Sequence, residues 1–351
     1  MQSAVNMLYS TRMTVDHLSQ MLDLIAVRGV VSGGAVTSGP WRAESIVDDE
    51  LKFCVMARGE AWLSTDGIDA AIHLVQGEVV VLNARSWLSL RGGDHSDEPT
   101  EVTPPSNGAM MWFAEGAGER TDAFIGGRID LDGPGRGLLL DALPPVAHIR
   151  AKTASAGRMR GTVDRLFDEL ASARPGSSFA VREYAQLLIL EALRAFAGGT
   201  AVRPGWLGLL ADDSLRPALE LIHGRPGAAL SLKDLARAAS MSRTAFAVRF
   251  RELAGMPPLT YLARWRMMLA KRELGSEDIR LRTLARELGY SSESSFSAAF
   301  KRSEGESPRS YRTRVLSESA RAPLQPGTTG RESASFGSRS PSDAVTQQGP
   351  S

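Results

Sequence analysis

Two segments of the chain carry nearly the same sequence. Residues 235–261 read LARAASMSRTAFAVRFRELAGMPPLTY, and residues 284–311 read LARELGYSSESSFSAAFKRSEGESPRSY. From the phenylalanines Phe246 and Phe296 onward, equivalent residues lie 50 positions apart, and the second copy has one extra residue before that point. Two copies of one supersecondary unit predict a domain built by duplication.

Each copy predicts two short helices joined by a tight turn. In the first copy, Ser231 is a favourable N-cap residue, and a second helix begins after Ser242. The apolar residues of the first helices lie at helical spacing, and those of the second helices repeat in the same way. These residues are Leu232, Leu235, Ala236, Ala239, Phe246, Phe250 and Leu253 in the first copy, and Leu281, Leu284, Ala285, Leu288, Phe296 and Phe300 in the second. The pattern predicts two helix-turn-helix units.

One longer helix is predicted between the two units, from about Leu259 to Leu274. A helix of about 16 residues is roughly 24 Å long, and major grooves recur about every 34 Å along one face of DNA. One polypeptide could therefore place its two second helices in successive major grooves. An ordinary pair of packed helices is the alternative for either copy alone, and the repetition within a basic region argues against it.

Charge is distributed unevenly along the 351 residues, whose formal net charge is +1. Residues 1–211 hold 19 Lys and Arg against 25 Asp and Glu, a net charge of −6. Residues 212–316 hold 19 against 12, a net charge of +7, and residues 317–351 hold 3 of each sign. This division predicts a polyanion-binding module joined to a part with a separate role. Two ordinary domains of different charge are the alternative.

Short β-type runs separated by glycine occupy residues 30–127. Examples are Phe53–Met56, Ala61–Leu63, Ala71–Leu74 and Val79–Leu82. Short strands with regular turn signals predict a small antiparallel barrel or sandwich. A short helix from about Thr14 to Ala26 is expected before them.

Two helical patterns follow the β-rich region, around residues 159–170 and 184–196. The second is apolar over most of its circumference, so we expect it to be buried in its own domain or against a second subunit. We therefore divide the chain into a β-rich sensor domain (14–150), a helical dimerisation segment (151–198), a linker (199–211), a DNA-binding domain (212–316) and a disordered tail (317–351).

Cys54 is the single cysteine of the sequence, which excludes an intrachain disulfide. Its neighbours Phe53, Val55 and Met56 predict a buried structural thiol. The sequence has neither a signal-peptide core nor a run of 18 apolar residues, so we expect a soluble cytoplasmic protein.

The repeated region resembles the DNA-binding domain of bacterial AraC/XylS-type transcription regulators over about residues 215–314. The residues that carry the resemblance are Leu235, Ala236, Ser242, Phe246, Phe250, Gly255, Pro258, Tyr261, Leu262 and Arg266, then Leu284, Ala285, Gly289, Tyr290, Ser292, Phe296, Phe300, Lys301, Gly305, Ser307, Pro308, Tyr311 and Arg312. Residues 22–150 are similar to the cupin-type N-terminal domain of one subgroup, through the runs Phe53–Leu63 and Gly77–Leu82, the turn Gly126–Gly127, and Leu143-Pro144-Pro145.

The resemblance implies an α+β fold of two domains. A small cupin-like β-barrel with helices would be followed by an all-α domain of two helix-turn-helix units joined by a long helix. It further implies a sequence-specific transcription regulator that binds double-stranded operator DNA, forms a homodimer, contacts RNA polymerase and responds to a small-molecule effector. Effector, operator and the sign of regulation stay open.

The resemblance also assigns candidate DNA contacts to the second helix of each unit. They are Arg243, Thr244, Ala247, Val248 and Arg251 in the first unit, and Glu293, Ser294, Ser297, Ala298, Lys301 and Arg302 in the second. Many relatives carry arginine where this chain has Val248 and Ala298, so we expect methyl and hydroxyl contacts with bases there. Arg251, Lys301, Arg302 and Arg309 are expected to meet phosphates, which fix register without reading sequence.

A cupin-type metalloenzyme is the competing class of function. Such a site needs two or three histidines and a carboxylate in one cavity. The five histidines (His17, His73, His95, His148 and His223) form no H-x-H or H-x-x-x-H pair, and His73 with Glu78 is the one suggestive neighbour pair. We therefore expect no enzyme, metal or cofactor. Phe53, Trp62 and Trp87 are the candidate lining of an effector pocket, and a purely structural dimerisation domain is the alternative.

Overall fold

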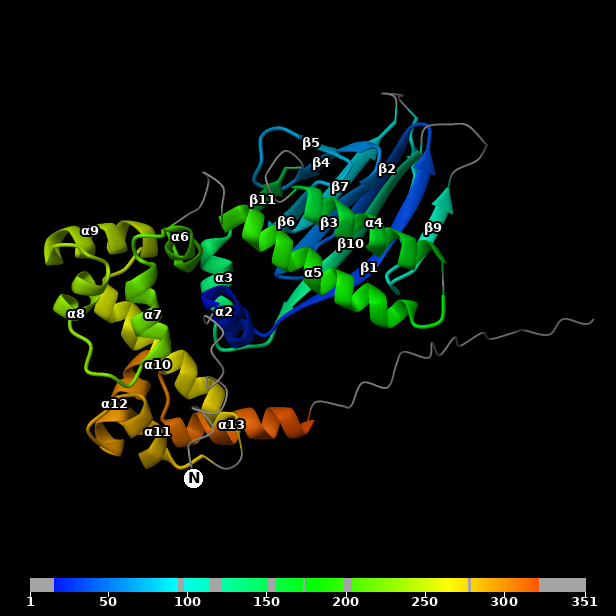
Figure 1. Cartoon of the computed structure of the whole chain (residues 1–351). Helices are drawn as coiled ribbons and strands as arrows, with labels where there is room; N and C mark the ends of the chain where they lie inside the picture. The colour runs from blue at the N-terminus through cyan, green and yellow to red at the C-terminus, as the bar shows by residue number, and fades with distance from the viewer. Residues whose placement is uncertain are drawn as a thin grey trace, which may run out of the picture.

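The computed structural model describes residues 16–93, 98–113, 121–150, 156–172, 174–197, 204–276 and 279–321 (Figure 1). The β-rich half is a sandwich of a six-stranded and a five-stranded sheet. The six-stranded sheet has the order β11 (Val146–Ile149), β6 (Val79–Asn83), β3 (Leu51–Arg58), β10 (Thr121–Leu131), β1 (Val27–Ser38) and β9 (Met110–Phe113). The five-stranded sheet has the order β5 (Ile72–Val75), β4 (Glu60–Thr65), β7 (Trp87–Gly92), β2 (Trp41–Ile46) and β8 (Thr100–Glu101).

Side chains fill the space between the two sheets. Cys54 and Met56 point inward from β3, as does Val80 from β6. Trp41 stacks on Phe124 with ring centroids 5.1 Å apart. Burial raises the pKa of the Cys54 thiol to about 12, so this cysteine packs as a small apolar residue, as the sequence predicts.

Helices α4 (Ala156–Ser172) and α5 (Ser177–Ala197) cover the outer face of the six-stranded sheet (Figure 1). Helices α2 (His17–Ile25) and α3 (Arg136–Ala142) lie at the end of the sandwich next to the helical C-terminal half. The predicted apolar helix is α5, and its buried residues, such as Leu188 and Ile189, pack in one cluster with Phe53, Val55 and Val81 of the sheet. The greater part of its apolar surface is thus covered within its own domain. The segment between β10 and α4 contains α3 and the strand β11.

The C-terminal half is entirely helical among the residues that the structure describes. Its elements are α6 (Trp206–Ala211), α7 (Arg216–Gly224), α8 (Leu232–Ala238), α9 (Arg243–Ala254), α10 (Pro258–Leu274), α11 (Leu281–Glu287), α12 (Glu293–Glu304) and α13 (Pro308–Arg321). Helices α8 and α9 form the first helix-turn-helix, α11 and α12 form the second, and α10 joins them. The predicted fold class is confirmed.

The duplication is visible in the packing of three aromatic rings in each unit. The ring centroid of Phe250 lies 5.6 Å from that of Phe246 and 5.5 Å from that of Tyr261, which it meets edge-on. The ring centroid of the equivalent Phe300 lies 5.9 Å from that of Phe296 and 5.5 Å from that of Tyr311, again edge-on. All four phenylalanines are fully buried. The same three rings therefore anchor the second helix of each unit to the helix that follows it, α10 or α13.

The turn between the two helices needs one residue with positive φ in each unit. Ser240 supplies it in the first (φ 54°) and Gly289 in the second (φ 79°). Serine at such a position is uncommon, whereas glycine adopts it without a steric penalty. Ser242 and Ser292 then cap α9 and α12 by accepting backbone N–H bonds. The extra residue of the second copy is Ser291, between Tyr290 and the cap.

Two segment boundaries differ from those expected. Of the predicted linker 199–211, residues 206–211 form α6, and its Trp206, Leu207 and Leu209 are buried; residues 199–203 lie outside the described ranges. The glycines around this segment concealed a short apolar helix. Residues 317–321 of the predicted tail continue α13, and residues 322–351 are likewise outside the described part. No helix of the described chain is long and apolar enough to cross a membrane.

Helices α2 and α6 join the two halves of the molecule. The indole N–H of Trp206 donates to the Leu138 carbonyl of α3 (3.1 Å), and the backbone N–H of Gly205 donates to the Leu253 carbonyl of α9 (2.7 Å). On the α2 side, His223 Nδ1 of α7 lies 3.2 Å from Nδ1 of His17. The first helix-turn-helix therefore touches the β-rich domain through α6.

Candidate nucleic-acid interface

Helix α9 presents its predicted contact residues on the face opposite its anchor. Phe246 and Phe250 are completely buried beneath the helix. Arg243, Thr244 and Arg251 are exposed, and Ala247 is half-buried. Val248 is 53% exposed. The five candidates of the first unit thus share one accessible helix surface.

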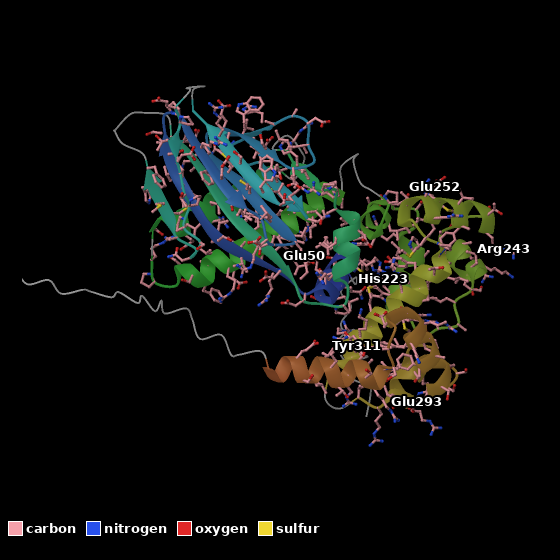
Figure 2. All side chains as sticks on the ribbon, turned by 180° about the vertical axis from the view of Figure 1, so that it is seen from behind. Glu50, His223, Arg243, Glu252, Glu293 and Tyr311 are labelled. Carbon is pink, nitrogen blue, oxygen red and sulfur yellow. The ribbon has the colours of Figure 1, made fainter. Side chains whose placement is uncertain are left out.

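Helix α12 has the same arrangement with a different chemistry. Phe296 and Phe300 are buried, whereas Ser294, Ala298, Lys301 and Arg302 are exposed. Glu293 and Ser297 are partly buried. Figure 2 shows Arg243 of α9 and Glu293 of α12 on the part of the helical domain that is turned away from the two sheets. The cupin-like domain leaves both helices accessible.

The charges on the two helices are not equally available. Arg243, Arg251 and Lys301 form no ion pair with any residue that the structure describes. Arg309, at the start of α13, lies 3.5 Å from the carboxylate of Glu293 and is 82% exposed. Helix α9 therefore begins with an uncompensated cation, Arg243, whereas α12 begins with an acid, Glu293, that has an internal partner.

Asp212 holds the back of α9 to the end of α6. Its carboxylate accepts from Arg249 Nε (2.9 Å) and from the backbone N–H of Ser214 (2.9 Å). Burial opposes ionisation of this carboxyl, but the hydrogen bonds from Ser214 and Arg249 outweigh it and lower the pKa of Asp212. Arg249 is thus a structural cation and is less available to DNA than its neighbours.

Four further cations lie at equivalent positions of the two units. Arg237 and Arg286 are exposed near the ends of α8 and α11, and Lys233 and Arg282 are exposed one turn earlier. The first helix of a helix-turn-helix crosses the DNA backbone. Sequence reasoning concentrated on the second helices and missed these residues. The repeat itself contains the signal, since each pair lies 49 positions apart.

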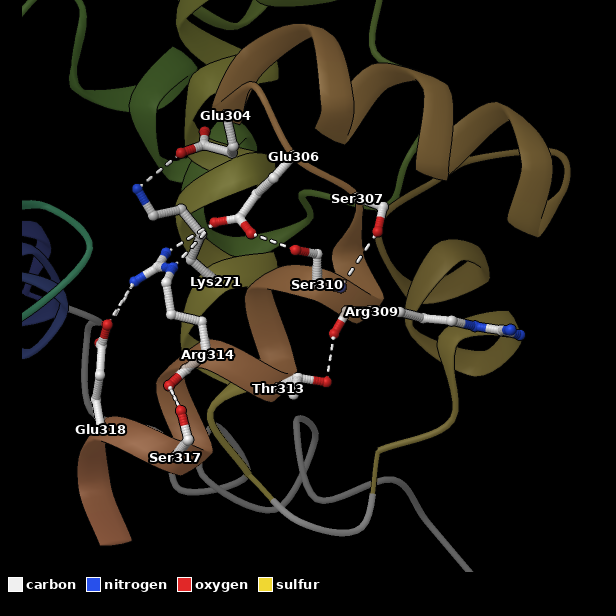
Figure 3. Close-up of polar contacts among 10 residues, drawn as sticks. All are labelled: Lys271, Glu304, Glu306, Ser307, Arg309, Ser310, Thr313, Arg314, Ser317 and Glu318. Atoms are coloured by element: carbon white, nitrogen blue, oxygen red, sulfur yellow. Dashed lines mark hydrogen bonds and ion pairs between the residues drawn. The ribbon is translucent and has the colours of Figure 1, made fainter. Parts of the chain in front are cut away.

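Helix α13 supports the second unit through charged contacts (Figure 3). Lys271 of α10 pairs with Glu304 at the end of α12 (2.9 Å). Arg314 of α13 pairs with Glu306 (2.8 Å) and Glu318 (3.3 Å). The hydrogen bond from Arg314 lowers the pKa of the Glu306 carboxyl. The Lys271 pair connects α12 to α10, and the Arg314–Glu306 pair connects α13 to the turn that follows α12.

The three candidate pocket residues of the N-terminal domain do not lie together. Phe53 is buried between the six-stranded sheet and the helices, where it borders an apolar cavity of about 20 Å³ with Leu139 and Leu193. Trp62 and Trp87 are 41% and 42% exposed on the outer face of the five-stranded sheet. The prediction of one shared pocket is wrong. Alternation along a strand fixes a face but does not show which face the helices cover.

The suggestive histidine pair is also separated. His73 Nε2 lies 3.0 Å from Glu60 and stacks on Trp62, whereas Glu78 lies 2.9 Å from Nε2 of His148 on β11. Among the described residues, no group of three or more His, Cys, Asp or Glu is placed to hold a metal ion. His95 lies outside them.

Comparisons with known proteins agree with this architecture. A cupin family model matches residues 16–198, and a helix-turn-helix domain model matches residues 235–314. The chain is 33% identical over 304 residues to an AraC-like transcription regulator of Streptomyces lividans, and 34% identical over 304 residues to one of Streptomyces antibioticus. Each match covers 85% of this chain and 98% of the relative.

Among solved structures, the DNA-binding domain of AdpA in complex with a target DNA is 29% identical, with a TM-score of 0.30, over 31% of this chain and 99% of that one. The relatives named above are regulators rather than enzymes. The chain belongs to the AraC-type family of transcription regulators, in the form with a cupin domain before the helix-turn-helix domain.

Proposed function

We propose that this protein is a sequence-specific regulator that inserts α9 and α12 into successive major grooves of one operator. The observation that carries the proposal is the pair of accessible helices, each anchored by the same aromatic triad and joined through α10. A helix in the major groove reads base edges with the side chains of its exposed face.

The two helices have different parts in this reading. Arg243 is a candidate for a bidentate contact with guanine, and the Thr244 and Val248 methyls suit thymine methyls. On α12, Ser294, Ser297 and Ala298 are small and permit close approach of the helix. Glu293 could accept from cytosine N4 only after leaving Arg309. The first half of the operator therefore has the stricter sequence requirement.

Phosphate contacts come from the cations around these faces. Arg251, Lys301, Arg302 and Arg309 flank the second helices, and Arg237 and Arg286 occupy equivalent places on the first helices. Such contacts supply affinity and register at every sequence. We propose a cytoplasmic location, because the operator DNA of a bacterial regulator lies there.

The regulator acts as a homodimer in this proposal, through the outward face of α5. Phe179 and Leu187 of that helix are 62% and 46% exposed, whereas its other apolar side chains are buried or partly buried. Leu187→Asp is expected to convert a sedimenting dimer into a monomer. Ile46→Asp is the matched control, because Ile46 is 77% exposed on the other side of the sandwich. A dimer that survives Leu187→Asp but not Ile46→Asp places the interface on the five-stranded sheet.

Control by a small molecule is proposed for the N-terminal domain. The apolar cavity beside Phe53 is bordered by Leu139 of α3, and α3 is bonded to α6 through Leu138 and Trp206. A ligand that displaces α3 would therefore affect α6 and the adjoining α9. A thermal-shift screen tests this, because a ligand at about 100 times its Kd adds about 2.7 kcal/mol. A domain with a structural role alone would give no shift with any compound.

Genomic footprinting of the purified protein tests the function directly. The expected result is a small set of protected promoters, each with two protected segments about one helical turn apart. In vitro transcription from these promoters with purified RNA polymerase then gives the sign of regulation. Uniform weak protection of all DNA would contradict sequence-specific binding.

A further inference from the structure

The two helix-turn-helix units touch each other directly, away from the helix that joins them. The loop between α7 and α8 passes against the turn of the second unit. A Cβ atom on Gly227 would lie 2.1 Å from the carbonyl oxygen of Glu287, and one on Gly289 would lie 2.5 Å from the carbonyl oxygen of Gly227. Real Cβ atoms do not approach backbone so closely, so the contact requires glycine on both sides.

Arg266 of α10 holds this loop in place. Its Nε donates to the Pro226 carbonyl (2.7 Å) and its Nη2 to the Ala228 carbonyl (2.9 Å). The guanidinium also lies 5.9 Å from the ring centroid of Tyr290, in the turn of the second unit. One half-buried side chain thus contacts both the loop before α8 of the first unit and the turn of the second unit.

The position of Arg266 gives it a mechanical role that the aromatic triads lack. Phe250 on Tyr261 attaches the first unit to the start of α10, and Lys271 with Glu304 attaches the second near its end. Both units also pack on the buried face of α10, which includes Trp265 and Met268. The contact at Arg266 differs from these because it lies where the two units touch each other directly.

We propose that Arg266, together with Gly227 and Gly289, is a positioning residue that sets the distance and angle between α9 and α12. The protein then accepts only operators whose two segments have one spacing. This inference rests on the proposed function. Each inserted base pair turns the second segment by about a tenth of a helical turn, and five turn it to the far side of the duplex.

The test measures binding of the full-length protein to its footprinted operator and to versions with one, two or five base pairs inserted between the segments. For the wild type, two inserted base pairs are expected to weaken binding by about 100-fold, the cost of losing contacts to two or more base pairs. For Arg266→Ala, we expect the Kd values at the native and altered spacings to differ by less than about tenfold, with weaker binding than the wild type at the native spacing. The ratio of the Kd values at the altered and native spacings, rather than either Kd alone, measures whether Arg266 fixes the arrangement of the two units.

Arg264→Ala is the matched control, because Arg264 is an exposed cation on the same helix. It is expected to keep the wild-type ratio. Arg266→Lys retains the charge but cannot reproduce both carbonyl bonds with the ring contact, so its ratio should fall between those of wild type and Arg266→Ala. If Arg266→Ala unfolds, Arg266→Lys and Gly227→Ala provide the same measurement.

A folded Arg266→Ala variant whose ratio of Kd values between spacings equals that of the wild type would overturn the positioning role of Arg266 and leave the proposed function standing. A wild-type protein that does not distinguish the footprinted operator from random DNA would overturn both the proposed function and the role of Arg266. The two failures are therefore distinguishable in one set of titrations.

Discussion

The carboxylate of Glu293 lies 3.5 Å from the guanidinium of Arg309, so the first turn of α12 carries an internal ion pair where it would meet DNA. An acid at this place repels phosphates and occupies a cation that would otherwise bind them. The pair therefore weakens binding to DNA in general, whereas a cytosine partner for Glu293 would recover part of that loss at one sequence.

Removing this acid should make binding tighter and less selective. For Glu293→Gln we expect tighter binding to random DNA by about 0.2–1 kcal/mol, the usual strength of an exposed pair, and a salt slope steeper by about one unit because Arg309 is released. Titrations at several salt concentrations measure both. Glu252→Gln is the control, since Glu252 is an exposed acid on the other recognition helix (Figure 2). An equal gain from Glu252→Gln would indicate net charge alone.

Arg243 and Lys301 should separate base reading from backbone binding. We expect Arg243→Ala to weaken operator binding by about 1–3 kcal/mol and to relax base preference at one position. Lys301→Ala should weaken binding to all sequences and flatten the salt slope by about one unit. Kd values for the operator and for random DNA at two or more salt concentrations distinguish them. Identical effects of both variants on both DNAs would refute this division.

The buried phenylalanines should act through stability alone. Phe250→Ala and Phe300→Ala each leave a cavity beneath a recognition helix, and we expect each to cost about 3–5 kcal/mol of unfolding free energy. Urea denaturation followed by circular dichroism measures this. Val248→Ala is the control on the exposed side of α9, where about 0.5 kcal/mol or less is expected. A loss of stability for Val248→Ala as large as for Phe250→Ala would show that the exposed face is packed.

His223 should make the contact between the domains sensitive to acid. Burial, and then the nearby His17, lower the pKa of His223 to about 3, while Tyr261 lies 3.0 Å from its Nε2. The unfolded chain takes up a proton below about pH 6.5 and the folded chain does not. The contribution of His223 to the unfolding free energy is therefore fully present above about pH 6.5, and it falls by about 1.4 kcal/mol per pH unit as the pH drops toward the folded pKa.

Urea denaturation at pH 7 and pH 5.5 tests this contribution. The difference between the two pH values should shrink in His223→Gln, whatever its absolute stability. A pH difference that persists fully in His223→Gln would assign it to other groups.

The duplicated helices were predictable because their signals are local. Caps such as Ser242, spacing such as Phe246 to Phe250, and the 50-residue offset all lie within short windows of sequence. The exposed faces of α9 and α12 follow from the same spacing. The spacing of the buried phenylalanines alone therefore predicts which residues lie on the opposite, exposed face of each helix.

The remaining features depend on tertiary contacts. Both faces of β3 are buried, so the alternation that would separate Phe53 from Cys54 carries no signal of inside and outside. Glu78 pairs with His148, 70 residues away, rather than with the neighbouring His73. Arg266 was recognisable as part of a family pattern, but its two carbonyl partners become visible only when the loop at Pro226 is folded back onto α10.

The positive-φ residues Ser240 and Gly289 show how far the two copies have diverged. Ser240 bears a side chain at its turn, whereas Gly289 has the backbone of Gly227 against it. Random mutagenesis should therefore recover glycine, asparagine and other residues without a β-branch at position 240, and almost none but glycine at position 289. The two copies of a duplication are interchangeable at first, but the contact with Gly227 now restricts the turn of the second copy alone. Placing glycine at position 240 should therefore be tolerated, whereas placing serine at position 289 should not.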